Sequence, residues 1–278
     1  MKGYYMNGQE LAQALRKGQR VYGTLIVSPS PKWLEYVPKL GLDYVFIDLE
    51  HIPLDRQTVS WMCQAYASRG LPPLVRILKP DPDLACAVLD GGAAGVVAPY
   101  VEKVEQVQAL RGAVKLRPLK GQRLTEALSG SHVCESELQE YQDTHNNNHL
   151  LILNIESKPA LDNLSDMLMV PGLDAVLIGP HDLSSSLGIP EQYFHPMFEQ
   201  AVETIIDKAR TRNIGVGFHT TYPQGLKQEI RWIHRGMNMV LHLADIISFC
   251  AKMEDDIQQI KTAVGDYVET QRDKLINI

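Results

Sequence analysis

The sequence has few cysteines and no long apolar run. Its four cysteines, Cys63, Cys86, Cys134 and Cys250, form no Cys-x-x-Cys pair. A chain of this length needs no disulfide bonds to stabilise a core, so we expect reduced thiols and a cytoplasmic location. Residues Met1–Asn7 contain one basic residue and no apolar segment, which argues against a signal peptide. No apolar run approaches the roughly 20 residues of a membrane helix, so we expect no membrane contact.

The sequence also lacks an excess of positive charge. It has 27 Lys and Arg against 33 Asp and Glu, a formal net charge of −6. A nucleic-acid-binding surface needs a basic patch or stripe, so we expect no nucleic-acid partner. The apolar fraction of 45% is ordinary for a globular protein with a core. The length of 278 residues fits one domain spanning 1–278, because an α/β barrel takes about 250 residues.

Short apolar runs alternate with longer amphipathic segments along most of the chain. This alternation predicts parallel strands that are buried on both faces, with helices between them. Eight such units in strict alternation favour a closed (β/α)8 TIM barrel over an open doubly wound sheet, which is the main alternative. The strands are expected at Val21–Val27, Tyr44–Asp48, Leu74–Ile77, Gly95–Ala98, Leu150–Ile155, Ala175–Gly179, Gly215–Phe218 and Met239–His242.

Helices are expected before, between and after these strands. An amphipathic N-terminal helix covers Asn7–Lys17, and a long helical stretch, Ile247–Lys274, follows the last strand. The polar segment Arg117–His149 predicts a long loop with one short helix near Glu135–Gln142, and loops of this length usually serve as a lid or an oligomer contact. The other helices are expected at Lys32–Lys39, Asp55–Ser68, Asp83–Asp90, Lys103–Gly112, Pro159–Met169, Met197–Arg210 and Gln224–Arg235.

Polar side chains end several of the apolar runs, and the carboxyl ends of strands are where a barrel carries its function. Asp48, Glu50 and His51 follow the second run. Asp48 either caps a neighbouring helix or pairs with His51, since a carboxylate can fix the tautomer of an imidazole that moves protons near neutral pH. Arg76 lies in the third run, where its planar fork suits a substrate carboxylate, a structural salt bridge to Asp48 or Glu50, or both.

Two more carboxylates follow the fifth and sixth runs. Glu156 and Asp182 are 26 residues apart, which is about one βα unit. Neighbouring strand ends could therefore place them side by side, and a divalent cation would relieve their mutual repulsion. Taken alone, Asp182 could equally be the N-cap of a following helix.

Four segments resemble the HpcH/HpaI aldolase family, whose members are class II pyruvate aldolases such as 4-hydroxy-2-oxoheptanedioate aldolase and 2-dehydro-3-deoxyglucarate aldolase. The resemblance runs from about Gly8 to about Ile247, and it implies a barrel of the phosphoenolpyruvate/pyruvate type. The segments that carry it are Ile47-Asp48-Leu49-Glu50-His51, Val75-Arg76, Ile155-Glu156 and Ile178-Gly179-Pro180-His181-Asp182-Leu183-Ser184.

The resemblance implies a carbon–carbon lyase that cleaves a 4-hydroxy-2-oxo acid to pyruvate and an aldehyde through a metal-bound pyruvate enolate. By this resemblance, Glu156 and Asp182 match the ligands of a divalent ion, Mg²⁺, Mn²⁺ or Co²⁺. Arg76 matches the arginine that binds the pyruvate carboxylate. His51 matches the catalytic base, and Asp48 matches the carboxylate paired with it.

The sequence departs from the family pattern around the substrate. Asn154 stands where the family usually has Gln, and His181 stands where it commonly has Ala; with Arg76 and Asp182, both are expected to contact substrate. The segment His242–Asp245 is expected to change the pocket rim. These departures leave the aldehyde open. A citrate-synthase-like condensation, a CoA-ester lyase and a non-catalytic binding barrel are therefore alternatives.

The resemblance also implies a homo-oligomer. The family tends to form a hexamer built from dimers, in which the last barrel helix is exchanged between subunits. The long C-terminal helical stretch of this sequence is consistent with such an exchange.

Overall fold

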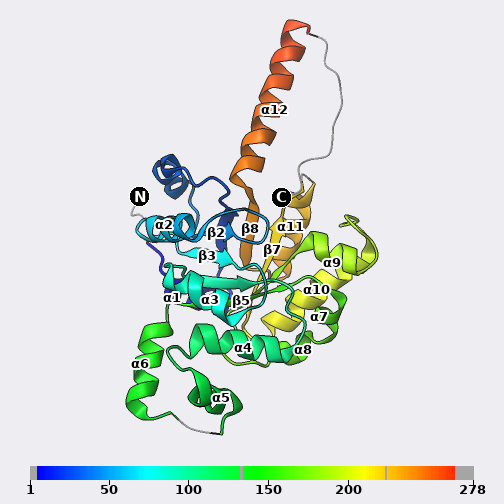
Figure 1. Cartoon of the computed structure of the whole chain (residues 1–278). Coiled ribbons are helices and arrows are strands. Elements are labelled where there is room, and N and C mark those ends of the chain that lie inside the picture. Colours follow the sequence, from blue (N-terminus) through cyan, green and yellow to red (C-terminus); the bar gives the residue numbers. More distant parts are fainter. Residues whose placement is uncertain (1–4, 132–133, 223, 267–278) are drawn as a thin grey trace.

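Eight parallel strands close into a barrel in the computed structural model of the chain, which describes residues 5–131, 134–222 and 224–266 (Figure 1). Each strand pairs with the next, and β8 pairs with β1. The predicted (β/α)8 fold is therefore confirmed. The strands are β1 (Val21–Leu25), β2 (Tyr44–Asp48), β3 (Pro73–Arg76), β4 (Gly95–Ala98), β5 (Leu150–Ile155), β6 (Ala175–Ile178), β7 (Gly215–Thr220) and β8 (Met239–Ala244).

Helices follow the strands, and α1 precedes the barrel. Most predicted elements agree with the structure to within about three residues at each end. The helices are α1 (Gly8–Arg16), the 3₁₀ helices η1 (Pro31–Glu35) and η2 (Val37–Lys39), α2 (Arg56–Ala67), α3 (Pro82–Asp90), α4 (Val104–Lys115), α5 (Gly121–Ser129), α6 (Ser136–Asn146), α7 (Lys158–Asp162), α8 (Leu164–Met167), α9 (Pro180–Ser186), α10 (Pro196–Arg210), α11 (Gly225–Arg235) and α12 (Asp245–Val264).

Two predicted helices are broken in the structure. Lys32–Lys39 forms η1 and η2 instead of one α-helix, since Pro38 has no amide hydrogen for an α-helical bond. Pro159–Met169 divides into α7 and α8 at Asn163, whose side chain donates a 2.9 Å hydrogen bond to the Glu102 carbonyl. The short helix α9 was not predicted.

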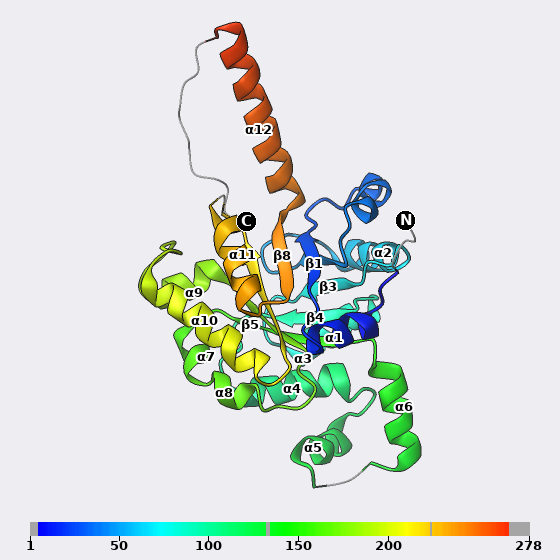
Figure 2. The same ribbon diagram turned by 180° about the vertical axis from the view of Figure 1, so that it is seen from behind.

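The segment predicted as a long loop, Arg117–His149, contains two helices, α5 and α6. The segment joins the end of α4 to the start of β5, and both of these points lie on the amino-terminal face of the barrel. Figures 1 and 2 show α5 and α6 extending from that side of the molecule, away from α12. The prediction that this segment forms a lid is therefore wrong for the carboxyl ends of the strands in the same chain, because these ends lie on the opposite face.

Apolar side chains fill the inside of the barrel and the layer between the strands and the helices. Phe46, Leu74, Val97 and Leu177 belong to the inner cluster and are at most 2% exposed. A strand buried on both faces cannot hold an unpaired charge, so polar groups collect where strands end. The strand register then decides which of these ends are neighbours.

The last helix, α12, projects away from the barrel (Figures 1 and 2). Among its residues only Ile247 is buried. The predicted stretch continued to Lys274, and its last residues lie outside the described part of the chain. No helix in that part is long and apolar enough to cross a membrane.

A buried carboxylate ties the amino-terminal face together. Asp174 lies in the loop before β6 and is fully buried, and it pairs with Arg16 of α1 and with the Lys115 ammonium of α4 at 2.6 Å. Its Oδ2 also accepts the Leu151 amide hydrogen at 2.8 Å. The Asp174 side chain thus links α1, α4 and β5 to β6, which begins at the next residue.

We expect Asp174→Asn to lower the free energy of unfolding by about 3 kcal/mol, because it leaves the largely buried Lys115 ammonium without its anion. Urea denaturation would measure this loss. Asp207→Asn is the matched control, since its pair with Arg235 is exposed and worth less than about 1 kcal/mol. Equal losses in the two variants would contradict a structural role specific to Asp174.

Candidate active site

The end of β2 is held to the end of β3 by a buried ion pair. Asp48 and Arg76 are register partners in these strands. The Arg76 Nε and Nη2 atoms donate to the two Asp48 carboxylate oxygens at 2.8 and 2.5 Å. Burial alone would raise the pKa of Asp48, but the Arg76 guanidinium outweighs it and holds that pKa below its usual range. The structural salt bridge considered from the sequence is therefore present.

Glu50, not Asp48, is the carboxylate nearest to His51. The Glu50 Oε2 atom lies 3.7 Å from His51 Nε2 and 3.1 Å from Arg76 Nη1. Asp48 uses both oxygens on Arg76 and also accepts the Glu50 amide hydrogen at 2.9 Å. The predicted Asp48–His51 pair is thus wrong as a direct contact, because Arg76 occupies the carboxylate that would have made it.

Glu50 is itself in an unfavourable place for a negative charge. Its side chain is only 11% exposed. Burial raises its pKa to about 7, because the attraction of Arg76 only partly offsets burial and the repulsion of the surrounding carboxylates. Glu50 and Asp48 both contact the Arg76 guanidinium at the mouth of the barrel.

Glu156 and Asp182 lie near each other, and Tyr100 contacts both of them. The Tyr100 amide donates to Glu156 Oε1 at 2.7 Å, and its hydroxyl donates to Asp182 Oδ1 at 3.3 Å. Burial raises the pKa of Glu156, and the charge of Asp182 raises it further. The structure therefore brings together the two carboxylates that the sequence singled out.

A glycine makes room for Glu156. A Cβ atom on Gly179 would lie 2.6 Å from Glu156 Oε2, well inside van der Waals contact. Gly179 is also the N-cap of α9, which begins with Pro180, and Asp182 lies in the first turn of that helix. The N-cap alternative for Asp182 is therefore wrong. A carboxylate in a helix's first turn is still stabilised by the helix dipole.

The two departures from the family pattern lie on different sides of these carboxylates. Asn154 is 1% exposed and donates its amide hydrogen to Glu156 Oε2 at 3.0 Å, so it helps to hold the Glu156 carboxylate in position. The His181 side chain is 55% exposed, and its Nδ1 lies 3.8 Å from Glu191 Oε1.

The segment His242–Asp245, which was expected to change the pocket rim, makes contacts with α11 and with the residues after β1. His242 faces the outside of the barrel, where its Nδ1 lies 2.8 Å from Glu229 Oε2 of α11. Asp245 accepts the amide hydrogens of Val27 and Ser28, both at 3.0 Å, and so fastens the end of β1. The change that the segment was expected to make at the pocket rim stays a prediction.

The carboxylates have the chemistry of a divalent-metal site. In residues 5–131, 134–222 and 224–266 no group of three or more His, Cys, Asp or Glu side chains is arranged to hold a metal ion. Glu156 and Asp182 nevertheless fit a hard cation such as Mg²⁺, because a cation would offset the repulsion between their negative charges. Mg²⁺ binds one or two protein carboxylates, and water and substrate fill its remaining coordination positions. Glu156 and Asp182 would hold it.

Sequence reasoning missed Tyr100 and gave Glu50 no role of its own. Tyr100 follows β4 in a loop and is 46% exposed, so no apolar pattern distinguishes it. Glu50 lies between Asp48 and His51 in one short segment, and only the fold shows that Glu50 contacts Arg76 as Asp48 does.

Comparison with known proteins gives consistent matches. A family model described as HpcH/HpaI aldolase/citrate lyase matches residues 22–240. A 2-keto-3-deoxy-L-rhamnonate aldolase of Escherichia coli strain K12 is 31% identical over 250 residues, which cover 90% of this chain and 92% of that protein. The structure of an HpcH/HpaI aldolase from Desulfitobacterium hafniense DCB-2 is 25% identical, with a TM-score of 0.77 and coverage of 90% of this chain and 96% of that chain. A citrate synthase structure has the same TM-score at 23% identity, covering 92% of this chain and 99% of that chain, which shows a shared fold.

The buried His219 of β7 should make the free energy of unfolding depend on pH. Burial, with the charge of Arg76, lowers the pKa of His219 to about 4. An unfolded histidine has a pKa near 6.5, so between about pH 6.5 and 4 the unfolded chain binds a proton that the folded chain does not. We expect His219 to contribute a fall in the free energy of unfolding as pH falls through this window, measured by urea denaturation as the difference between wild type and a His219 variant. The comparison is needed because Glu50, with its pKa raised to about 7, contributes in the opposite direction.

The His219→Gln variant should show a shallower fall, because it removes the proton difference at this position. The exposed His234 provides the control, and His234→Gln should keep the wild-type slope. An unchanged slope in His219→Gln would show that the buried imidazole is not responsible.

Proposed function

This chain belongs to the HpcH/HpaI aldolase/citrate lyase family, and on that premise we propose that it is a divalent-metal-dependent class II aldolase that cleaves a 4-hydroxy-2-oxo acid to pyruvate and an aldehyde. The observation that carries the proposal is the convergence of Glu156, Asp182 and Arg76 at one end of the barrel, where two carboxylates for a cation interact with one guanidinium for an anion. The curated relative acts on 2-keto-3-deoxy-L-rhamnonate, so a 2-keto-3-deoxy sugar acid is the substrate class that we propose.

Arg76 provides the carboxylate-binding group. Its Nε and one Nη2 hydrogen bind Asp48, and Nη1 lies beside Glu50, so further N–H groups remain for a ligand among its five donors. The bidentate pair with Asp48 fixes the plane of the guanidinium. A fixed guanidinium orients the substrate carboxylate toward Glu156 and Asp182, because its donors point in set directions.

His51 is the proposed base. It is 43% exposed at the mouth of the barrel, with Glu50 as its nearest carboxylate. In the cleavage direction a base removes the proton from the C4 hydroxyl, the C3–C4 bond breaks to release the aldehyde, and its electron pair enters an enolate. A proton then adds at C3 to give pyruvate. A histidine exchanges protons readily near neutral pH, and Glu50 can stabilise its charged form.

A bound divalent cation would supply Lewis-acid stabilisation of the developing enolate charge. Glu156 and Asp182 would hold it, and Asn154 and Gly179 keep Glu156 in place. We propose Mg²⁺, Mn²⁺ or Co²⁺ as the ion, and contact of substrate with Asn154 and His181 belongs to the same proposal. The four free cysteines support the proposed cytoplasmic location.

Solvent deuterium should exchange into the methyl group of pyruvate only when the protein is loaded with metal, since exchange needs the enolate but no aldehyde. NMR would follow it with and without EDTA. We expect His51→Ala and Arg76→Ala to lower the exchange rate by at least about 100-fold, a typical contribution of a positioned acid–base group. The exposed His234→Ala variant should exchange like wild type. No exchange by the metal-loaded wild type would refute the aldolase and favour the binding barrel.

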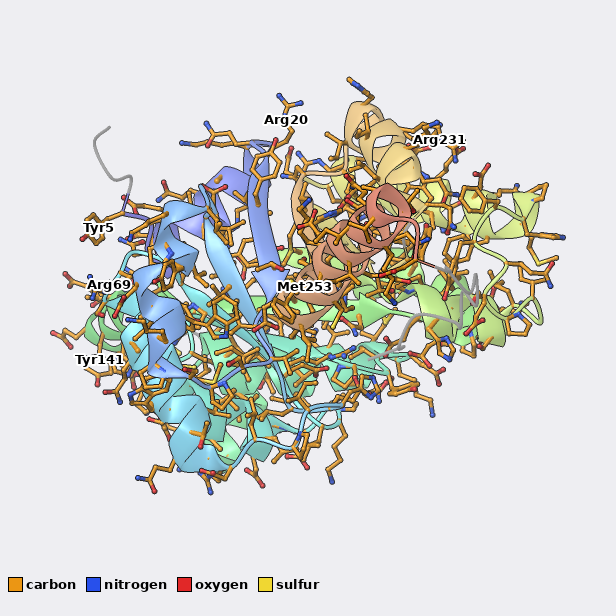
Figure 3. The ribbon with its side chains drawn as sticks, turned by 90° about the horizontal axis from the view of Figure 1, so that it is seen from above. Tyr5, Arg20, Arg69, Tyr141, Arg231 and Met253 are labelled. Atoms are coloured by element: carbon orange, nitrogen blue, oxygen red, sulfur yellow. The ribbon has the colours of Figure 1, made fainter. Side chains whose placement is uncertain are left out.

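We also propose that the chain forms a homo-oligomer by exchange of α12, a hexamer by family resemblance. One side of α12 carries exposed apolar residues at intervals of three or four, which is the spacing of one helix face. In most barrels the last helix covers β8 and β1, but here it projects away, and Tyr22 on β1 stays 42% exposed. The apolar face consists of Ile246, Phe249, Met253 (labelled in Figure 3), Ile257, Ile260 and Val264.

Charge on this face should dissociate the oligomer. We expect Met253→Asp with Ile257→Asp to shift the protein to monomers in size-exclusion chromatography with light scattering, because the face could no longer be buried against a second copy. Gln259→Asp places one such charge on the other side of α12 and should leave the assembly intact. A monomeric wild type would contradict the proposal.

A further inference from the structure

Tyr100 contacts both candidate metal ligands although it belongs to neither of their strands. It follows β4, whereas Glu156 follows β5 and Asp182 lies in α9. Its amide hydrogen binds Glu156 Oε1 at 2.7 Å and its hydroxyl binds Asp182 Oδ1 at 3.3 Å. A single residue therefore relates the positions of the two carboxylates.

The backbone of Tyr100 is in a conformation that needs an explanation. Its φ angle is +50°, in the left-handed region that residues other than glycine seldom adopt. Such a conformation persists only where surrounding contacts impose it. Here the bond from the Tyr100 amide to the buried Glu156 carboxylate is the contact that favours it, and the same backbone turn directs the ring toward Asp182.

The hydroxyl stays a hydrogen-bond donor at neutral pH. An ordinary tyrosine hydroxyl has a pKa of about 10 and therefore keeps its proton at neutral pH. A phenol that does not ionise can donate to a carboxylate without adding negative charge to a site that already has a surplus of it. Groups that donate to metal-binding side chains orient them and commonly affect metal affinity by 10- to 100-fold.

We propose that Tyr100 is a positioning residue that sets the relative placement of Glu156 and Asp182 for a divalent cation. The inference rests on the proposed function, because it concerns the same pair of carboxylates. It adds a residue from β4 to a site otherwise built by β2, β3, β5 and α9. The aromatic hydroxyl acts through Asp182, and the backbone amide acts through Glu156.

Binding of Mn²⁺ alone, measured by calorimetry, tests this without any turnover. Tyr100→Phe removes only the hydroxyl, and we expect it to weaken Mn²⁺ binding by about 10-fold at the long hydrogen bond observed. Tyr100→Gly keeps the amide and accepts the left-handed backbone, so it should show a similar loss. Tyr22→Phe removes the hydroxyl of an exposed tyrosine on β1 and should bind like wild type.

The melting temperature in EDTA separates positioning from a general structural role. For Tyr100→Phe we expect a value within about 1 °C of wild type. Wild-type or tighter Mn²⁺ affinity in Tyr100→Phe would overturn the inference and leave the proposed function standing. Absence of Mn²⁺ binding by the wild type would overturn both.

Discussion

Closure of the parallel sheet is the constraint from which the rest of the structure follows. Because the sheet closes and helices surround most of it, β2 to β7 are buried on both faces, while β1 and β8 are partly exposed. Charged groups can then stand only where strands end, and all strands end on one face. The Asp48–Arg76 pair, Glu156 and Asp182 are consequences of this rule, since each follows or closes an apolar run. Strand register adds the second restriction by making Asp48 the direct neighbour of Arg76.

Periodicity and strand ends were enough to predict the barrel and most of its candidate site. The runs at β2, β4 and β5 were located to the residue, because a strand buried on both faces is a continuous apolar segment. The Asp48–His51 pair was wrong because nearness in sequence says nothing of direction: Asp48 points to a partner one strand away. Tyr100 could not have been found, since its importance lies in a backbone turn and in contacts to residues 56 and 82 positions later. The helix α5 was missed, and only one short helix was predicted where α6 lies, because this segment is polar and has few apolar residues to bury.

The site has a shortage of positive charge. Asp48, Glu50, Glu156 and Asp182 lie near the guanidinium of Arg76, and the pKa values of Glu50 and Glu156 are raised by burial first and by the neighbouring carboxylates second. Asp48 is the exception, with a lowered pKa, because it has the largest share of Arg76. Such a balance favours a divalent cation beside Glu156 and Asp182 and a ligand anion beside Arg76. The proposed aldolase chemistry needs both in one place, and the described residues supply the groups for both.

The Asp174 cluster and the candidate active site lie on opposite faces of the barrel. The first links α1, α4 and β5 through contacts that no ligand would touch. The second is built from the carboxyl ends of strands and the segments that follow them, which carry none of those links. Substitutions that alter substrate preference can therefore accumulate at one face while the opposite face preserves the fold. Descendants of such a chain could acquire new reactions without first acquiring compensating mutations for stability.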